Sequence, residues 1–257
     1  MNTGPLTVDR LDGGAIWRVA IGGSRGNILD ATVMQALTGW FGEAAAAPHL
    51  KAICLEGQGA HFSFGASVPE HVPPHAEAML ETFHGALLAM MDSHVPVLAA
   101  VRGQCLGGGL ELVSLCHRVF AAKDARLGQP EIMLGVFAPV ASIALADRVG
   151  RGAADDLCLT GRSVTAADAL AMRLVDEIAE ADPAEAALAW ARTHLLPKSA
   201  SSLRYAVRAS RASLRARLGH ELPAIERLYL EGLMSTSDAR EGLNAFMERR
   251  PPAWRDA

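Results

Sequence analysis

The sequence predicts an α/β fold that gives way to helices toward the C-terminus. In the first half, short apolar runs that end near glycine alternate with longer segments whose apolar residues recur at helical spacing. After residue 139, helical spacing dominates. Because short strands alternating with helices are typical of an α/β core, we expect the first half to form a sheet and the second half to be largely helical.

Four apolar runs are the expected strands: residues 15–21, 51–57, 95–101 and 118–122. Between the first two runs, Asp30 can cap a helix. The apolar residues that recur at helical spacing in this segment are Val33, Met34, Leu37, Trp40 and Phe41. A second helical pattern extends from about residue 76 to residue 91. The order strand, helix, strand, helix, strand supports the α/β prediction.

Cap residues mark the helices of the second half. Ser163 or Thr165 is the expected cap of one helix. Asp182 caps the next, with Pro183 at the first helical position, and Pro197 ends it. We therefore expect a core over residues 1–196 and a helical appendage over residues 197–257.

Composition excludes several classes of protein. The chain has 257 residues, half of them hydrophobic, which is enough for one large domain or a domain with an appendage. The net charge of −4 gives no overall attraction for nucleic acid or for an anionic membrane, so neither is an expected partner. No apolar stretch approaches the roughly 18–20 residues of a membrane span. Residues 1–14 lack the pattern of a signal peptide.

The four cysteines are scattered, without a C-x-x-C pair: Cys54, Cys105, Cys116 and Cys158. This usage is typical of reduced thiols in a cytoplasmic protein.

Two short patterns resemble functional motifs but favour simpler interpretations. GGSRG at residues 22–26 matches the G-x-S-x-G of hydrolases, yet it follows the first strand without convincing partner residues, so we predict a plain turn. His71 and His75 have metal-ligand spacing, but Pro73 and Pro74 between them rule out a regular helix. We expect surface histidines and no metal.

Four arginines follow one face of a predicted helix: Arg204, Arg208, Arg211 and Arg215. They lie beside an apolar stripe of leucine and valine. We predict a solvated helix face. The alternative is a surface that binds nucleic acid or an acidic partner.

The stretch VRGQCLGGGLEL, residues 101–112, carries the strongest chemical signal. A strand ends, three glycines follow and a helix begins, which leaves free N–H groups at the helix N-terminus. Neither a P-loop nor a G-x-G-x-x-G pattern is present. The stretch therefore predicts a donor site for a single oxyanion.

Two glutamates accompany this stretch. Glu111 lies three residues after Gly108, so its carboxylate lies near the same helix face as the Gly108 N–H; the alternative is a glutamate that only complements the helix dipole. Glu131 follows Pro130 further along the chain. Two such glutamates can divide acid and base roles, but spacing leaves open whether they converge.

A third stretch, HFSFGASVPEH at residues 61–71, places bulky rings before Gly65 and Ala66. By itself it is a plain turn or a place where bare backbone approaches a ligand.

Residues 95–136 resemble the crotonase (enoyl-CoA hydratase/isomerase) family, through LGGGLEL, the cysteine and strand that follow, and GQPE. Further resemblance lies in RGNILDATVMQAL, in LTGRSVTAADALAMRLVDEI and in FMERRPPAWRDA, so that it covers nearly the whole chain.

The resemblance implies a spiral of ββα repeats with a helical C-terminal trimerisation region, as a homotrimer or a dimer of trimers. It implies an acyl-CoA substrate and no cofactor beyond the CoA of that substrate. The oxyanion-hole N–H groups fall on Ala66 and Gly108, and the catalytic glutamates of hydratases on Glu111 and Glu131. Retention of both glutamates favours water addition.

Departures from the family pattern point to an unusual acyl group. Ser67 stands where an aspartate is usual and Phe64 where a small residue is usual, and Phe137 and Pro139 lie in a segment that is usually glycine-rich. The combination resembles the cyclohexa-1,5-diene-1-carbonyl-CoA hydratases of anaerobic aromatic degradation, which form 6-hydroxycyclohex-1-ene-1-carbonyl-CoA. Phe64, Phe137 and Pro139 are the expected acyl-pocket residues.

Alternatives to this activity are a straight-chain enoyl-CoA hydratase, a ring-opening hydrolase or isomerase of CoA esters, and a non-enzymatic binding protein.

Expected contacts to CoA lie in two places. Arg25, Ser67, Val68 and Pro69 come from the two loops near the start of the chain. Arg249 or Arg250 is a further candidate from the C-terminal tail of the same or a neighbouring subunit.

Overall fold

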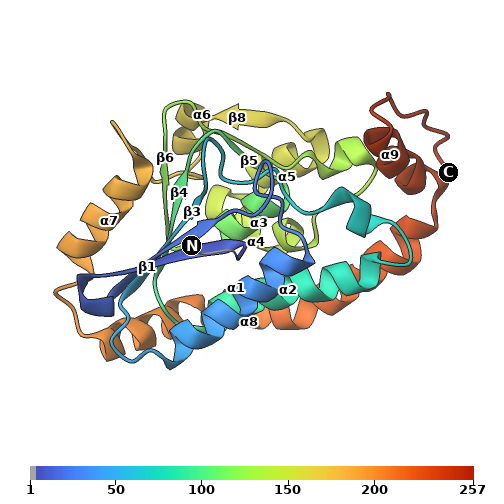
Figure 1. Ribbon diagram of the computed structural model, residues 1–257. Coiled ribbons are helices and arrows are strands. Elements are labelled where there is room, and N and C mark those ends of the chain that lie inside the picture. The colour runs from blue at the N-terminus through green and yellow to red at the C-terminus, as the bar shows by residue number, and fades with distance from the viewer. Residues whose placement is uncertain (1–3) are drawn as a thin grey trace.

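The computed structural model describes residues 4–257 and contains a six-stranded sheet in the order β1-β2-β3-β4-β6-β9 (Figure 1). Its strands are β1 (Leu6–Leu11), β2 (Ile16–Ile21), β3 (Ala52–Gly57), β4 (Val97–Val101), β6 (Arg118–Ala121) and β9 (Glu177–Ile178). β1 pairs with β2 in antiparallel fashion, and the remaining neighbours are parallel. A smaller sheet contains β5 (Gln104–Leu106), β7 (Arg126–Gly128) and β8 (Ser163–Thr165).

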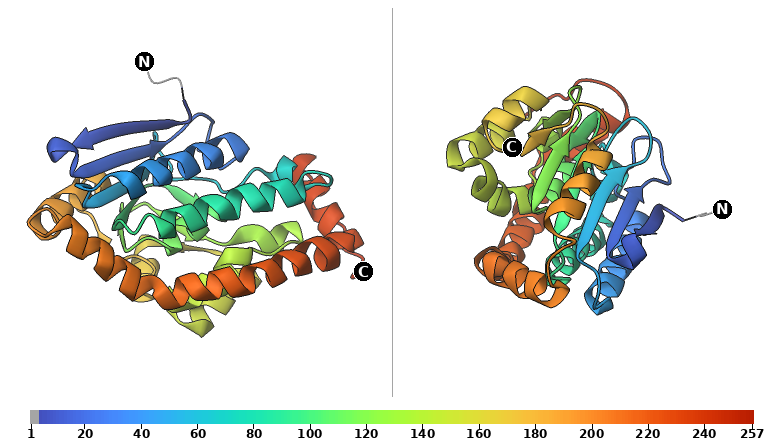
Figure 2. Two further views of the ribbon diagram at one scale, coloured as in Figure 1. Left: turned by 90° about the horizontal axis from the view of Figure 1, so that it is seen from below. Right: turned by 90° about the vertical axis from the view of Figure 1, so that its left-hand side faces the viewer.

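The helices cover both faces of the main sheet. They are α1 (Ala31–Ala46), α2 (Ala76–Asp92), α3 (Gly108–Ser114), α4 (Pro139–Val149), α5 (Arg151–Thr160), α6 (Ala166–Ala171), α7 (Pro183–His194), α8 (Ala200–Arg227) and α9 (Ser237–Met247). Successive side chains of a strand point to opposite faces. Ile16, Cys54 and Leu98 accordingly pack against α7, whereas Trp17 and Ile53 belong to the large core on the other face. α1 and α2 lie side by side, and α8 extends along α2 and α4 (Figure 2).

The four expected strands and the helix over residues 76–91 are confirmed, with slightly different ends. Asp30 caps α1 by accepting the Val33 N–H at 2.9 Å. Asp182 caps α7. Thr165 rather than Ser163 caps α6, because only its hydroxyl forms the reciprocal capping box with Asp168. The strands β1, β5, β7, β8 and β9 escaped prediction, because four of them have only two or three residues and β1, although six residues long, carries the charged residues Asp9 and Arg10.

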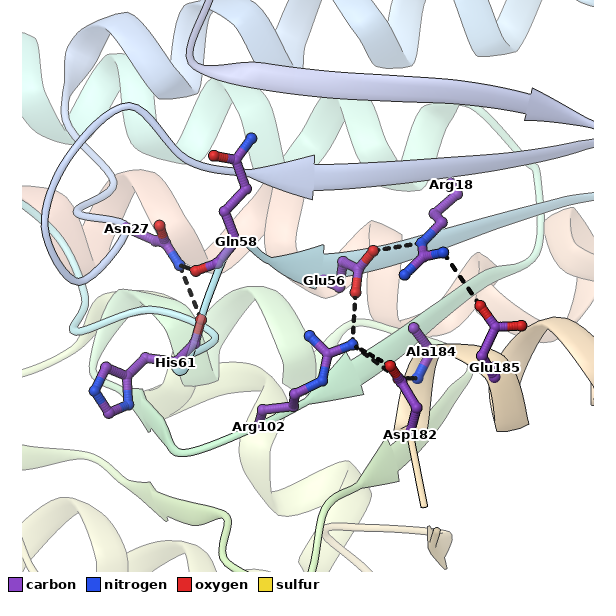
Figure 3. A network of polar contacts seen from close by, with 9 residues as sticks. All are labelled: Arg18, Asn27, Glu56, Gln58, His61, Arg102, Asp182, Ala184 and Glu185. Atoms are coloured by element: carbon purple, nitrogen blue, oxygen red, sulfur yellow. Dashed lines mark hydrogen bonds and ion pairs between the residues drawn. The ribbon is translucent and has the colours of Figure 1, made fainter. Parts of the chain in front are cut away.

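A buried carboxylate joins the central strands to α7 (Figure 3). Glu56 on β3 accepts from Arg18 on β2 at 2.5 Å and from Arg102, just beyond β4, at 3.0 Å. Arg102 also pairs with Asp182, the cap of α7, at 2.8 Å. Because a buried charge is costly unless it is paired, this network holds the ends of three elements in register next to the loop that follows Arg102.

The prediction of a solvated arginine face on α8 is wrong for three of its four residues. Arg204 donates to the carbonyls of Ala44 and Ala47 at the end of α1, at 2.9 and 2.6 Å, and to Ser93 after α2 at 3.0 Å. Arg211 donates to the Cys116 carbonyl, and Arg215 pairs with Asp92. The last carbonyls of a helix lack partners within it and carry partial negative charge. These arginines therefore dock α8 onto the core, and Arg208 alone of the four is exposed.

The structure also shows what GGSRG and the pair His71 and His75 form. GGSRG forms a turn in which the Ser24 hydroxyl accepts the Ile28 N–H. His71 ends a 3-10 turn and His75 precedes α2, so the two do not share a helix. Across residues 4–257 there is no group of three or more His, Cys, Asp or Glu side chains that could hold a metal ion. Within the same residues, no helix is long and apolar enough to span a membrane.

We predict that Arg204→Ala lowers the free energy of unfolding by roughly 1–3 kcal/mol, because several helix-end carbonyls then lose their hydrogen-bond donor. The matched control is Arg208→Ala on the same helix, which should change stability by no more than about 0.5 kcal/mol. Urea unfolding at one fixed protein concentration measures both. Equal stabilities of the two variants would contradict the docking role of Arg204.

Candidate active site

Two loops that are distant in sequence are joined by backbone hydrogen bonds. Ser63 and Cys105 form a parallel bridge. The Ser63 N–H donates to the Gln104 carbonyl at 3.1 Å, and the Leu106 N–H donates back to Ser63 at 3.0 Å. This pairing places Ala66, three residues beyond Ser63, beside Gly108 at the start of α3.

Glycines make this close approach possible. Gly65 has φ +100°, and a Cβ atom there would lie 2.9 Å from the Leu106 carbonyl oxygen. A Cβ atom on Gly108 would lie 2.7 Å from the Phe83 ring and 3.2 Å from the Ala66 nitrogen. Within residues 4–257, neither the Ala66 N–H nor the Gly108 N–H donates to a protein acceptor. Two neighbouring free donors of this kind can bind one oxygen atom.

Asn27 and Ser63, which sequence reasoning missed, hold the first loop in place. The Asn27 amide donates to the carbonyls of Gln58 and His61 at 3.0 and 2.8 Å (Figure 3). The Ser63 hydroxyl donates to the Asn27 carbonyl and accepts the Gly65 N–H. Asn27 lies inside RGNILDATVMQAL, which carries the family resemblance, and Ser63 lies inside HFSFGASVPEH, but their roles depend on contacts that spacing does not reveal.

Glu111 is buried within α3, and its carboxylate reaches the N-terminus of α4. Its Oε1 atom accepts the N–H groups of Val140 and Ala141 at 2.8 and 2.9 Å. Burial raises the pKa of Glu111, whereas the nearby His84 and the two backbone donors lower it. The carboxylate thus lies in a dry environment that still contains three groups favouring its charged form.

Glu131 lies on the other side of the glycine triplet, in a 3-10 turn (Pro130–Leu134). A Cβ atom on Gly107 would lie 2.5 Å from Glu131 Oε1, so glycine is needed there to make room for the carboxylate. Glu131 is half-buried, with its Oε2 atom enclosed. Burial and then the charge of Glu111 raise the pKa of Glu131 to about 8. The structure therefore brings together the two glutamates whose convergence spacing left open.

An open pocket of about 1040 Å³ adjoins the two loops. Its lining includes most of the residues predicted to bind CoA or the hole oxygen: Arg25, Ala66, Ser67, Val68, Pro69 and Arg250. Arg250 of this same chain lines the pocket while pairing with Glu241 and Glu248. Arg249 is not part of the lining.

The three residues predicted for the acyl pocket separate into two places. Phe64 is 44% exposed in the open pocket, against Gly26 and edge-on to His61. Pro139 is the first residue of α4, directly before the two N–H groups that hold Glu111. Phe137 packs edge-on against Tyr229, with ring centroids 5.3 Å apart.

Tyr229 is a further residue of the site that sequence reasoning missed. It is buried, and its hydroxyl has no hydrogen-bond partner within the described residues. Burial, and then the charges of Glu131 and Glu111, raise the pKa of Tyr229. The side chain therefore lies near both glutamates, although it belongs to the C-terminal helical region.

Comparison with known proteins identifies relatives over almost the full chain. The family model described as enoyl-CoA hydratase/isomerase matches residues 16–257. A cyclohexa-1,5-dienecarbonyl-CoA hydratase of Thauera aromatica is 48% identical over 97% of this chain and 96% of its own. A probable enoyl-CoA hydratase of Mycobacterium tuberculosis, echA8, is 34% identical over 88% of each chain.

Solved structures agree with this result. An enoyl-CoA hydratase from Mycobacterium avium subsp. paratuberculosis superposes with a TM-score of 0.83 at 27% identity, covering 99% of this chain and 100% of the other. EchA1_1 from Mycobacterium paratuberculosis superposes with a TM-score of 0.87 at 25% identity over both whole chains. With a matching family model, close relatives and the same architecture, this chain belongs to the enoyl-CoA hydratase/isomerase family and has the crotonase fold.

Proposed function

We propose that the protein hydrates cyclohexa-1,5-diene-1-carbonyl-CoA to 6-hydroxycyclohex-1-ene-1-carbonyl-CoA, as a step in anaerobic aromatic degradation. The observation that carries this proposal is the pair of glutamates beside two free backbone N–H groups, one of which belongs to Ala66 in the lining of a pocket of about 1040 Å³. The 48% identity to a hydratase with that printed activity supports the choice of substrate.

The chemistry requires stabilisation of a developing enolate. Water attacks the β carbon of the conjugated thioester, and electron density moves to the thioester oxygen and along the diene. Ala66 and Gly108 supply the two donors for that oxygen, because both N–H groups are free within residues 4–257 and the two residues lie side by side. The proton is then delivered to the far diene carbon, and one ring double bond remains, shifted.

The surroundings of the two glutamates support a division of roles. Glu111 accepts two N–H groups at the start of α4, which favours its carboxylate form, so it serves as the base that takes a proton from water. Glu131 has a pKa raised to about 8 and keeps its proton at neutral pH, so it serves as the acid. Each turnover then leaves Glu111 protonated and Glu131 ionised.

Ring side chains near the glutamates support a cyclic acyl group. Phe137, Pro139 and Tyr229 place rings next to the glutamates, and flat rings pack well against a flat ring substrate. We retain Phe137 and Pro139 as acyl-pocket residues and add Tyr229. Phe64, which is exposed in the open pocket, is reassigned to the CoA side together with Arg25, Ser67, Val68 and Pro69.

We also propose a homotrimer or dimer of trimers that acts in the cytoplasm and needs no cofactor beyond the CoA of its substrate. Residues 197–257 are the proposed trimerisation region, next to a core of residues 1–196. Large apolar side chains exposed on this region, among them Tyr205 and Leu228, support a role in subunit contacts.

A panel of CoA esters tests the substrate. We expect kcat/KM for the cyclic dienoyl ester to exceed that for crotonyl-CoA by roughly tenfold or more, since pocket shape typically discriminates at that level. Mass spectrometry should find one added water, with ring and thioester intact. Preference for crotonyl-CoA would favour the straight-chain hydratase, whereas a ring-opened or unhydrated isomeric product would favour a hydrolase or an isomerase.

Glu111→Gln and Glu131→Gln should each reduce kcat by about 10²–10⁴, because each removes one proton-transfer group. Binding of the CoA ester should persist in both variants, as measured by equilibrium titration. With Glu131 as the acid, kcat of the unmodified protein should fall as pH rises through about 8. Activity that instead rises up to that pH would make Glu131 the base, and full activity in either variant would remove that glutamate from the mechanism.

Gly108→Ala should reduce kcat/KM by about 10²–10³, the effect of losing one oxyanion donor, because the new Cβ atom would collide with Phe83 and displace the N–H group. The control is Gly85→Ala in α2, where a Cβ atom meets nothing within 4 Å. Steady-state kinetics on the preferred ester compares the two. Equal activity of the two variants would show that Gly108 is not a donor.

A further inference from the structure

His84 is a buried histidine on α2 that the proposed hydration chemistry does not use. Its Nδ1 atom lies 2.6 Å from Oε1 of Glu226, near the end of α8. Its Nε2 atom is enclosed by the protein and has no hydrogen-bond partner in the described part of the chain. Buried polar atoms are nearly always paired, so this nitrogen points to a ligand or water within the site.

The position of His84 links the surface to the catalytic base. The Glu226 side chain is 28% exposed and that of His84 is 3% exposed. Glu111 is also buried, and it lies near enough for the charge of His84 to lower its pKa. A partly exposed carboxylate, a buried imidazole and a second, buried carboxylate are therefore neighbours.

Tyr229, another unpartnered polar group near the glutamates, is less suited to carry protons. Its raised pKa keeps the hydroxyl protonated at neutral pH. An imidazole, by contrast, has two ring nitrogens, so it can accept a proton on one while it donates through the other.

We propose that His84, held by Glu226, carries a proton from Glu111 to solvent between turnovers. The proposal rests on the proposed function, in which each hydration leaves Glu111 protonated and Glu131 ionised. Glu111 passes its proton through a bridging water to His84 Nε2, while the proton on Nδ1 moves to Glu226, which releases it to solvent. A half-turn of the imidazole ring then exchanges its two nitrogens, so that an N–H again faces Glu226 and a bare nitrogen again faces Glu111. Glu131 regains a proton from water after product leaves, so no net proton is consumed.

The test separates the first turnover from the following ones. Enzyme in excess over the cyclic dienoyl ester reports the single-turnover rate, and excess ester reports the steady-state rate. We expect His84→Gln to retain the single-turnover rate within about twofold and to lose roughly tenfold or more in steady-state rate, as for loss of an acid–base group. Glu226→Gln should do the same, because glutamine still accepts the Nδ1–H but does not take up its proton.

The control is His117→Gln. His117 also has one paired ring nitrogen, which accepts the Val97 N–H at 3.0 Å, and an enclosed Nε2 without a partner in residues 4–257. It should leave both rates unchanged. Should His84→Gln fail to fold, the less buried Glu226→Gln decides the question.

Two results would overturn the relay. Equal loss of both rates would assign His84 and Glu226 to positioning Glu111, and no loss in either rate would leave them without a role. Failure of the proposed function is recognised differently, since the unmodified protein would then show no first turnover on the ester.

Discussion

The site depends on the parallel pairing of residues 62–63 with residues 104–106. Backbone groups in a protein interior must find partners, and these two segments satisfy one another through the bonds of Phe62 and Ser63 to Gln104 and of Leu106 to Ser63. Each segment leaves this pairing a few residues further on, and there the N–H groups of Ala66 and Gly108 have no acceptor within residues 4–257. The proposed oxyanion hole is therefore a consequence of where regular pairing stops. Asn27 stabilises this pairing further, since its side chain donates hydrogen bonds to the carbonyls of Gln58 and His61, which precede Phe62.

The electrostatics of the site follow from the burial of two carboxyl groups away from water. Burial alone favours the neutral form of each group. Two backbone donors at the N-terminus of α4 reduce that effect for Glu111, although burial still raises its pKa overall, and the charge of Glu111 in turn favours a proton on Glu131. One geometric feature, the start of α4 at Pro139, thus accounts for the division of acid and base roles proposed for the pair.

The C-terminal helices belong to this site as much as to any subunit contact. α8 is docked on the core by arginines that bind the carbonyl ends of α1 and α2 and the Cys116 carbonyl. That docking brings Glu226 to His84 and places Tyr229 beside Phe137. α9 lies against the 3-10 turn that carries Glu131 and supplies Phe246 to the wall of the open pocket. A region predicted as an appendage is thereby part of the proposed acyl site.

The sequence by itself determined features that depend on near neighbours in the chain. The main strands, the caps Asp30 and Asp182, the turn at GGSRG and the glycine-to-helix transition before Glu111 all followed from residues a few positions apart, and the family resemblance supplied the fold and the pair Ala66 and Gly108. Only the tertiary structure decided that Glu131 meets Glu111, that Phe64 lies in the open pocket, that Arg204 binds helix ends and that His84 meets Glu226. Those contacts join segments far apart in the chain, and local periodicity carries no information about which distant groups will compensate a buried charge or an unpaired carbonyl.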